Sequence, residues 1–364
     1  MMQEWTNPYN SFNSYKGLLY RKQFDGIISG NFLPPVEVNI DPCNNCNLNC
    51  IWCNAKKIIN RNDKVMMTTE HLLELIDFCA DWGVKAICFA GGGEPTLHPY
   101  LSIAFERCHD LGLESAIITN GLFMNEEQLE NIAKYARWIG VSVDADCPGT
   151  YEKCKNVDKF DNVIDNIKKL VDLGSREVTF KYLIHPENQY GVYNACKIAK
   201  DIGVDCFHSR LISTRYLDNK EYNDCKDINS NSVEDTFDFD EINKQFDMCR
   251  KLDSDDFKVF TIRHKQDGEG NRRILFNKCR VSSLLCMFEA NGTTSICIDR
   301  KGDVETMLCR HDNVENIRDI WGSHYHKKLI GDIDPKTDCS KCTMNVYHEI
   351  LNAYEQDLFC KNFP

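Results

Sequence analysis

Three cysteines, Cys46, Cys50 and Cys53, lie close together in the sequence and could bind a metal centre. Thiolates select iron–sulfur clusters, zinc or copper(I). A four-iron cluster normally takes four protein thiolates, so a loop with three leaves one iron open to another ligand. An open position distinguishes a reactive metal site from a closed structural one. A zinc knuckle or a set of buried thiols is the alternative, but no second C-x-x-C or Cys/His pair lies nearby.

A glycine run followed by a carboxylate, Gly91-Gly92-Gly93-Glu94, comes about 40 residues after these cysteines. Glycine lets the backbone approach a ligand closely, and a carboxylate accepts charge-assisted hydrogen bonds from an ammonium group. Alone, such a run would be a common turn. Both motifs follow predicted strands, at 36–40 and 86–90, so we expect them at the same carboxyl-terminal edge of a parallel sheet.

Cys-x-x-x-Cys-x-aromatic-Cys followed by Gly-Gly-Glu resembles the signature of the radical S-adenosylmethionine (SAM) enzymes, over roughly residues 36–212. The resemblance implies that the three cysteines hold a [4Fe–4S] cluster whose open iron chelates SAM. Reductive cleavage of SAM would then give a 5′-deoxyadenosyl radical that takes a hydrogen atom from the substrate. It also implies that Gly92, Gly93 and Glu94 hold the SAM amino group.

Further SAM contacts are implied at other strand ends. Trp52 would line the adenine side, with a packed core tryptophan as the alternative. Ser142 and Asp144 stand where relatives carry a ribose-binding Ser-x-Asp-Gly, although Ala145 replaces the glycine. Asn120 is similarly placed and also suits a simple turn. Lys181 is a candidate catalytic residue that could face the pocket, or an ordinary salt-bridged lysine.

The C-terminal cysteines resemble the ligands of a SPASM domain in its shortened "twitch" form, which encloses one auxiliary [4Fe–4S] cluster. The implied ligands are Cys279, Cys297, Cys339 and Cys342, with Cys286 as a substitute for one of them. Cys309 is a candidate catalytic hydrogen donor. Cys309 and Cys360 could equally be buried small hydrophobes, and Cys43 is interpreted as a bystander.

Alternating strand and helix patterns predict an α/β fold, with parallel strands and right-handed crossovers. Six units would make a partial (β/α)6 parallel barrel of the radical SAM type, with an open doubly wound sheet as the competing architecture. We expect three regions: a lead-in at 1–35, the partial barrel at 36–255 with an acidic loop or linker at 217–238, and a small cysteine-rich α+β domain at 256–364. The last region contains a predicted hairpin of 293–298 and 303–308.

Composition narrows the class of protein. Twenty cysteines among 364 residues, without a signal peptide, favour metal or redox chemistry in the cytoplasm over a disulfide framework. The net charge of −12 disfavours a nucleic-acid partner, and no apolar run is long enough to span a membrane. A ferredoxin or flavodoxin is the reductant that the resemblance implies.

Three functions follow from these motifs. A closed auxiliary cluster suits electron transfer, so the first hypothesis is a radical SAM oxidoreductase that dehydrogenates a small polyol, sugar or aminocyclitol. The second is a maturase that oxidises, crosslinks or epimerises a peptide or protein. The third, a non-catalytic iron–sulfur or zinc protein, leaves the Gly-Gly-Glu motif unexplained.

Overall fold

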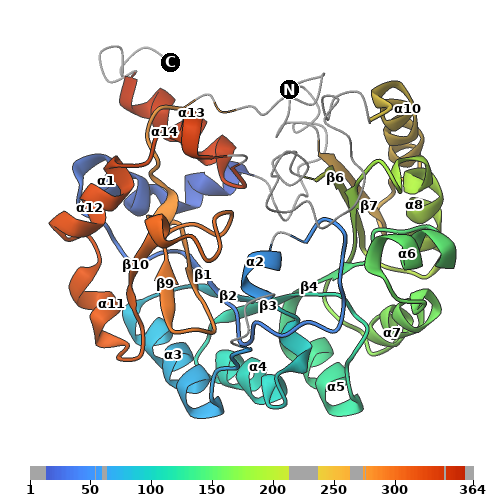
Figure 1. Cartoon of the computed structure of the whole chain (residues 1–364), viewed down its shortest axis with the longest axis horizontal. Coiled ribbons are helices and arrows are strands. Elements are labelled where there is room, and N and C mark those ends of the chain that lie inside the picture. Colours follow the sequence, from blue (N-terminus) through green and yellow to red (C-terminus); the bar gives the residue numbers. More distant parts are fainter. Residues whose placement is uncertain are drawn as a thin grey trace.

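The computed structural model describes residues 14–53, 55–59, 64–212, 237–262, 274, 276–339 and 342–356. Its described strands form one curved ten-stranded sheet in the order β10-β9-β8-β1-β2-β3-β4-β5-β6-β7 (Figure 1). From β1 to β7 every neighbouring pair is parallel. These strands are β1 Glu37–Ile40, β2 Ala86–Phe89, β3 Glu114–Thr119, β4 Ala136–Ser142, β5 Val178–Ile184, β6 Cys206–Leu211 and β7 Lys258–Ile262.

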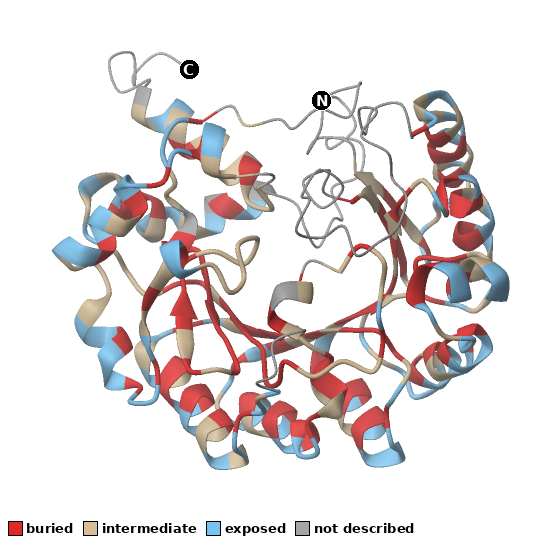
Figure 2. Cartoon of the chain, viewed as in Figure 1, coloured by how far each residue is buried: buried red, intermediate tan, exposed pale blue. Residues whose placement is uncertain are grey.

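Helices cover the outer face of the sheet, with their buried sides toward the strands and their exposed sides toward solvent (Figure 2). The large apolar core lies between these two layers. The connecting helices are α3 Thr69–Trp82, α4 Leu101–Asp110, α5 Glu126–Tyr135, α6 Pro148–Lys155, α7 Phe160–Asp172, α8 Val192–Asp201 and α10 Phe239–Arg250. The predicted α/β fold with a parallel, partial-barrel sheet is confirmed.

Helix α3 shows how local sequence sets these elements. The Thr68 hydroxyl accepts a hydrogen bond from the N–H of His71 at 3.2 Å, which caps the first turn. Leu72, Leu75 and Ile76 recur at helical spacing and are buried against the sheet. Gly83 then ends the helix at φ 100°, a left-handed conformation that glycine adopts without strain.

The C-terminal region extends the same sheet. Strand β7 adds one parallel strand beyond the six predicted, and β8 Leu285–Phe288 pairs in parallel with the other side of β1. The predicted hairpin forms with shorter strands, β9 Thr293–Ser295 and β10 Met307–Arg310, paired antiparallel. Val304–Thr306 is a 3₁₀ turn instead of strand, because the Asp303 side chain accepts the Glu305 N–H and caps it.

Short helices complete the chain around β8–β10: α11 Glu315–Ile320, α12 His324–Gly331, α13 Pro335–Asp338 and α14 Asn345–Gln356. The lead-in forms a 3₁₀ turn, Ser14–Tyr20, and helix α1 Arg21–Ser29. Phe24 and Ile27 of α1 share a small core with Leu351 of α14. Most of the predicted acidic loop at 217–238 lies outside the described residues. Within the described part, no helix has the length and apolar character needed to cross a membrane.

Candidate active site

The predicted metal loop begins directly after β1, and α2 Lys56–Ile59 follows it. The thiols of Cys46, Cys50 and Cys53 are half-buried and close enough to interact electrostatically. Burial raises the pKa of Cys46 to about 12 and that of Cys53 to about 11. A thiolate in this poorly solvated place therefore needs a cation beside it, as metal ligation provides. The donor set fits a thiolate-bound metal cluster.

The glycine run packs directly on the cysteine loop. A Cβ on Gly93 would lie 2.0 Å from the carbonyl oxygen of Asn45, and one on Gly91 would lie 1.7 Å from that of Gly93. The N–H of Gly93 donates to the Cys43 carbonyl at 3.1 Å, and that of Glu94 to the Asn45 carbonyl at 2.6 Å. The thiol of Cys43, interpreted as a bystander, donates back to the Glu94 carbonyl. Two motifs far apart in sequence therefore form one rigid unit.

The Glu94 carboxylate is buried and anchored by the ends of two strands. Its Oε1 accepts hydrogen bonds from Thr96 N, Thr96 Oγ1 and Thr119 Oγ1 at 3.1, 2.8 and 2.5 Å. Its Oε2 accepts one from Asn120 N at 2.7 Å. Burial raises the pKa of Glu94, and these hydrogen bonds oppose that rise. Because three of the four bonds fall on Oε1, Oε2 keeps capacity to accept from a ligand.

Asn120 links β3 to the cysteine loop as well as shaping its own turn. Its side-chain oxygen accepts from the N–H of Leu122 at 2.9 Å, as a turn asparagine does. Its amide nitrogen donates to the side chain of Asn47 at 2.7 Å. Both interpretations of Asn120 therefore describe part of its geometry, and contact with SAM stays a prediction.

A buried ion pair lies where a ribose contact was predicted. Asp144, at φ 58°, accepts from Lys155 and, at 2.6 Å, from the N–H of Leu183. The side chains of Lys155 and Asp144 are only 3% and 1% exposed. Burial alone would lower the pKa of Lys155, but the opposing charge of Asp144 raises it. Both carboxylate oxygens of Asp144 therefore already accept hydrogen bonds, and one of them holds the Lys155 ammonium in place.

Lys155 and His185 enclose Trp52 and were not predicted from the sequence. The Lys155 ammonium lies 5.5 Å from the Trp52 ring centre, and the His185 ring stacks on Trp52 at 5.1 Å. The backbone carbonyl of Lys155 also accepts from Asn49 N in the cysteine loop. In the sequence Lys155 ends a polar helix and resembles a surface lysine, so no local signal marked it.

Lys181 and Ser142 occupy paired positions on β5 and β4, and both are half-buried. The Lys181 ammonium lies 5.6 Å from the ring centre of Trp138. Cys88 of β2 interacts electrostatically with Lys181, whereas its neighbours Ile87 and Phe89 belong to the helix-side core. Lys181 therefore lies on the face of the sheet that looks away from the helices. Its catalytic role stays a prediction.

Comparison with known protein families identifies the domain that contains the cysteine loop and the glycine run. Residues 40–199 match the model of the Radical SAM superfamily. The chain contains a radical SAM domain. The family implies a [4Fe–4S] cluster and SAM, and Cys46, Cys50 and Cys53 with Gly91–Gly93 lie together where both would bind.

The relatives that this chain matches are named for different activities. The chain is 25% identical over 300 residues to a probable GTP 3′,8-cyclase of Saccharolobus islandicus (strain M.14.25 / Kamchatka #1), covering 81% of this chain and 90% of the relative. It is 33% identical over 122 residues to an S-adenosylmethionine-dependent nucleotide dehydratase of Flammeovirga pacifica, covering 33% of this chain and 41% of the relative.

Solved structures share the fold at low sequence identity. Streptococcus suis SuiB bound to the precursor peptide SuiA superposes with a TM-score of 0.67 at 18% identity, over 91% of this chain and 75% of SuiB. Native anSMEcpe with bound AdoMet superposes with a TM-score of 0.61 at 14% identity, over 91% of this chain and 100% of anSMEcpe. These likenesses extend beyond the radical SAM domain.

Three of the four predicted auxiliary cysteines, Cys279, Cys297 and Cys339, pack against one small apolar core in the C-terminal region. Cys297 interacts electrostatically with Cys279 and Cys339, and Cys342 interacts with Cys279 and Cys297. Burial raises the pKa of Cys297 and of Cys342. Among the described residues, no three His, Cys, Asp or Glu side chains converge on a single-ion position. Four soft thiols in one poorly solvated place fit a thiolate-bound cluster.

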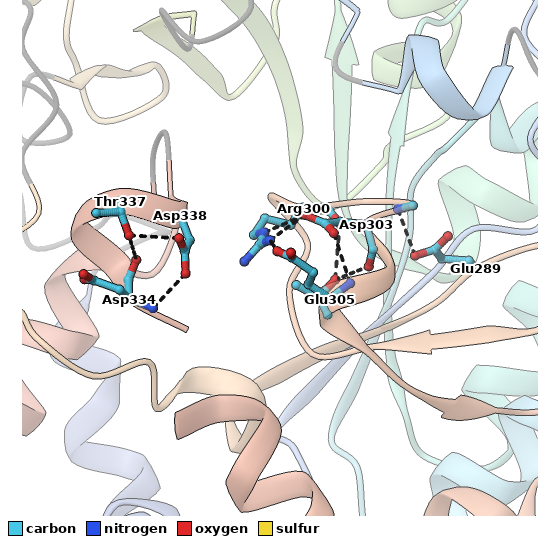
Figure 3. A network of polar contacts seen from close by, with 9 residues as sticks. Glu289, Arg300, Asp303, Glu305, Asp334, Thr337 and Asp338 are labelled. Atoms are coloured by element: carbon cyan, nitrogen blue, oxygen red, sulfur yellow. Dashed lines mark hydrogen bonds and ion pairs between the residues drawn. The ribbon is translucent and has the colours of Figure 1, made fainter. Parts of the chain in front are cut away.

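The loop after β9, residues 297–303, contacts both cysteine sites. On one side, Asp299 accepts from Thr343 N at 2.5 Å and from Thr343 Oγ1 at 2.9 Å, which holds the chain after Cys342. On the other side, the Lys301 ammonium lies 3.0 and 2.9 Å from the two carboxylate oxygens of Asp41, at the end of β1. In the same loop, the N–H of Gly302 donates to Oε1 of Glu289 at 3.2 Å, and Glu289 is labelled in Figure 3.

Two other cysteines of this region differ in their place: Cys286 lies in the large core, whereas Cys309 packs against the same small core as Cys279, Cys297 and Cys339. Cys286 of β8 is paired with Val38 and buried in the helix-side core, where it interacts with Cys79 of α3. Cys309 of β10 interacts with Cys286 and with Thr294. The contacts of Cys286 favour packing, and the roles of Cys286 as a substitute ligand and of Cys309 as a hydrogen donor stay predictions. Cys360 lies outside the described residues.

Proposed function

We propose that this radical SAM enzyme is an oxidoreductase that removes two hydrogens from its substrate. The carrying observation is that Cys279, Cys297 and Cys339 pack against one small core, with Cys342 near enough to Cys279 and Cys297 to interact electrostatically. Four thiolates would fill every protein-facing position of an auxiliary [4Fe–4S] cluster, so that cluster would accept an electron without binding the substrate. Hydrogen-atom abstraction followed by loss of one electron and one proton turns a secondary alcohol into a ketone.

One set of residues would hold the first cluster and SAM, and another would surround the substrate. Cys46, Cys50 and Cys53 would hold the first cluster, with Gly92, Gly93 and Glu94 at the SAM amino group. Bound SAM supplies the 5′-deoxyadenosyl radical once an external ferredoxin or flavodoxin provides an electron. The Asp144–Lys155 pair fixes the environment of Trp52, and Ser142 and Lys181 face the space inside the sheet.

A small, hydroxylated substrate suits the inner face of the sheet. Lys181, Lys301 and Asp41 interact there with Cys88, on the side away from the helix core. Charged and hydrogen-bonding groups orient a polyol, sugar or aminocyclitol better than an apolar compound, because they can exchange hydrogen bonds with its hydroxyl or amino groups. We therefore favour secondary-alcohol dehydrogenation.

Peptide or protein modification is the second candidate. It is favoured by the superposition with peptide-bound SuiB, which extends over 91% of this chain. A nucleotide substrate is a third possibility to include in assays, because the relatives include a probable GTP 3′,8-cyclase and a nucleotide dehydratase.

Mass spectrometry of the reconstituted enzyme with SAM and a reductant would test the proposal. Separate reactions would contain polyols and aminocyclitols, GTP, and peptide candidates. We expect 5′-deoxyadenosine release and a polyol product lighter by two hydrogens. A change confined to the peptides would favour the maturase, one confined to GTP would favour nucleotide chemistry, and absence of SAM cleavage throughout would favour a non-catalytic metal protein.

A further inference from the structure

We infer that Arg300 donates a hydrogen bond to the auxiliary centre held by Cys279, Cys297, Cys339 and Cys342, and so raises its reduction potential. This rests on the proposed function, which includes the auxiliary cluster. Arg300 follows Cys297 by three residues, in the loop 297–303 that contacts both cysteine sites.

The guanidinium of Arg300 is buried and only partly satisfied. Its Nε and Nη2 donate to Asp303 Oδ2 at 2.8 and 2.6 Å, and Nη2 also donates to Glu305 at 2.6 Å. The side chain is 7% exposed. Its remaining nitrogen, Nη1, is buried and has no hydrogen-bond partner among the described residues. A buried donor without an acceptor destabilises the folded chain, so a group that accepts from Nη1 would recover that free energy.

The position of Arg300 indicates which group accepts. Figure 3 shows Arg300 between its carboxylate partners and the turn from Asp334 to Asp338. That turn, α13, leads directly to Cys339, and Arg300 interacts electrostatically with Cys339. The next residue, Lys301, points the other way and pairs with Asp41. Arg300 is thus the cation of this loop that faces the auxiliary cysteines.

An N–H donor of positive charge favours the reduced form of such a cluster, because reduction adds a negative charge. Hydrogen bonds to cluster sulfurs are among the factors that set its potential. The carboxylate of Glu305, which is 72% exposed, pairs with Nη2 of the guanidinium, whereas Nη1 stays buried without a partner among the described residues. The proposed electron acceptor would thereby be made easier to reduce.

A redox titration followed by electron paramagnetic resonance tests this inference. The full chain with Cys46, Cys50 and Cys53 changed to alanine would carry the auxiliary cluster alone, about four irons. In that background we expect Arg300→Gln to shift the reduction equilibrium about tenfold toward the oxidised form, a potential lower by about 59 mV for one electron. Arg300→Lys keeps the charge without the planar fork and should give a smaller drop.

Arg310→Gln is the matched control, because it removes the same charge from an exposed arginine of β10 that pairs with Asp312. We expect its potential to equal that of the parent. If Arg300→Gln and Arg300→Lys both keep about four irons and the parent potential, the inference is wrong while the auxiliary cluster stands. If Arg300→Gln loses iron, Arg300→Lys becomes the deciding variant. An unchanged reduction potential in Arg300→Lys would then overturn the inference about Arg300. A background protein without iron overturns the auxiliary cluster itself.

Discussion

The two cysteine sites of this molecule are built in opposite ways. Cys46, Cys50 and Cys53 come from one loop after β1, and the rigid turn Gly91–Gly93 supports them. The auxiliary cysteines come from three separate segments: before the 3₁₀ turn Val281–Ser283, after β9, and around 339–342. The first site offers three thiols near the buried carboxylate of Glu94, and the second has four cysteines near one another. Under the proposed function, the contiguous loop would hold the open, reactive cluster, and the cysteines from distant segments would hold the closed one.

Removing the open site should have the largest effect. Cys50→Ala takes away one of only three thiols in the loop, so we expect SAM cleavage to be lost completely. Chromatographic measurement of 5′-deoxyadenosine under reducing conditions checks this. Retained cleavage would contradict the assignment of this loop.

The ion pair beneath the open site should give the next largest effect. Lys155→Met leaves Asp144 buried without its cation, which costs about 3–5 kcal/mol in the free energy of unfolding. Urea unfolding measures this cost, and Asp144→Asn combined with Lys155→Met should restore part of it. Arg107→Gln breaks the exposed pair with Asp77 and should cost about 0–1 kcal/mol. Equal costs for the two pairs would contradict the burial argument.

The junction of the two motifs can be broken without touching a cysteine. Gly93→Ala would force a Cβ against the Asn45 carbonyl, and such overpacking costs about 1–3 kcal/mol. Because this strain falls on the turn that would hold SAM, we expect SAM binding to weaken by about fivefold or more in calorimetry, since about 1.4 kcal/mol is tenfold. Gly149→Ala, where a Cβ meets nothing within 4 Å, should bind SAM as the parent does. Identical binding in both variants would show that the junction tolerates a side chain.

The smallest effect is expected outside the four auxiliary cysteines. Cys286→Ala removes a thiol that lies in the helix-side core, so iron content should stay at about eight per chain. Colorimetric iron analysis after reconstitution tests this. A drop to about four irons would mean that Cys286 is a ligand after all.

Much of the fold could be predicted because its signals are local. The strands from β1 to β6 are short apolar or alternating segments of the sequence. The helices between them end at residues such as Gly83, Gly112 and Gly203, which have the positive φ that glycine allows. Strands β7 and β8 were not predicted. Their identity as strands depends on the free edges of β6 and β1, which lie far away in sequence.

The part of the candidate site that lies in local sequence motifs could also be predicted. The spacing of Cys46, Cys50 and Cys53 and the following Gly-Gly-Glu motif marked the open site. Lys155 and His185 were missed, because only the folded chain places them against Trp52. The resemblance named the four auxiliary cysteines, but not the loop with Arg300 and Lys301 that contacts both sites.

The central claim is that the chain has one open and one closed cysteine site. Iron content and SAM cleavage, measured on the parent and on a double variant, test this claim most directly. The reconstituted parent should hold about eight irons, and Cys339→Ala with Cys342→Ala should hold about four. The double variant should still release 5′-deoxyadenosine and should no longer oxidise substrate. Eight irons in that variant, or loss of SAM cleavage together with the iron, would contradict two separate sites.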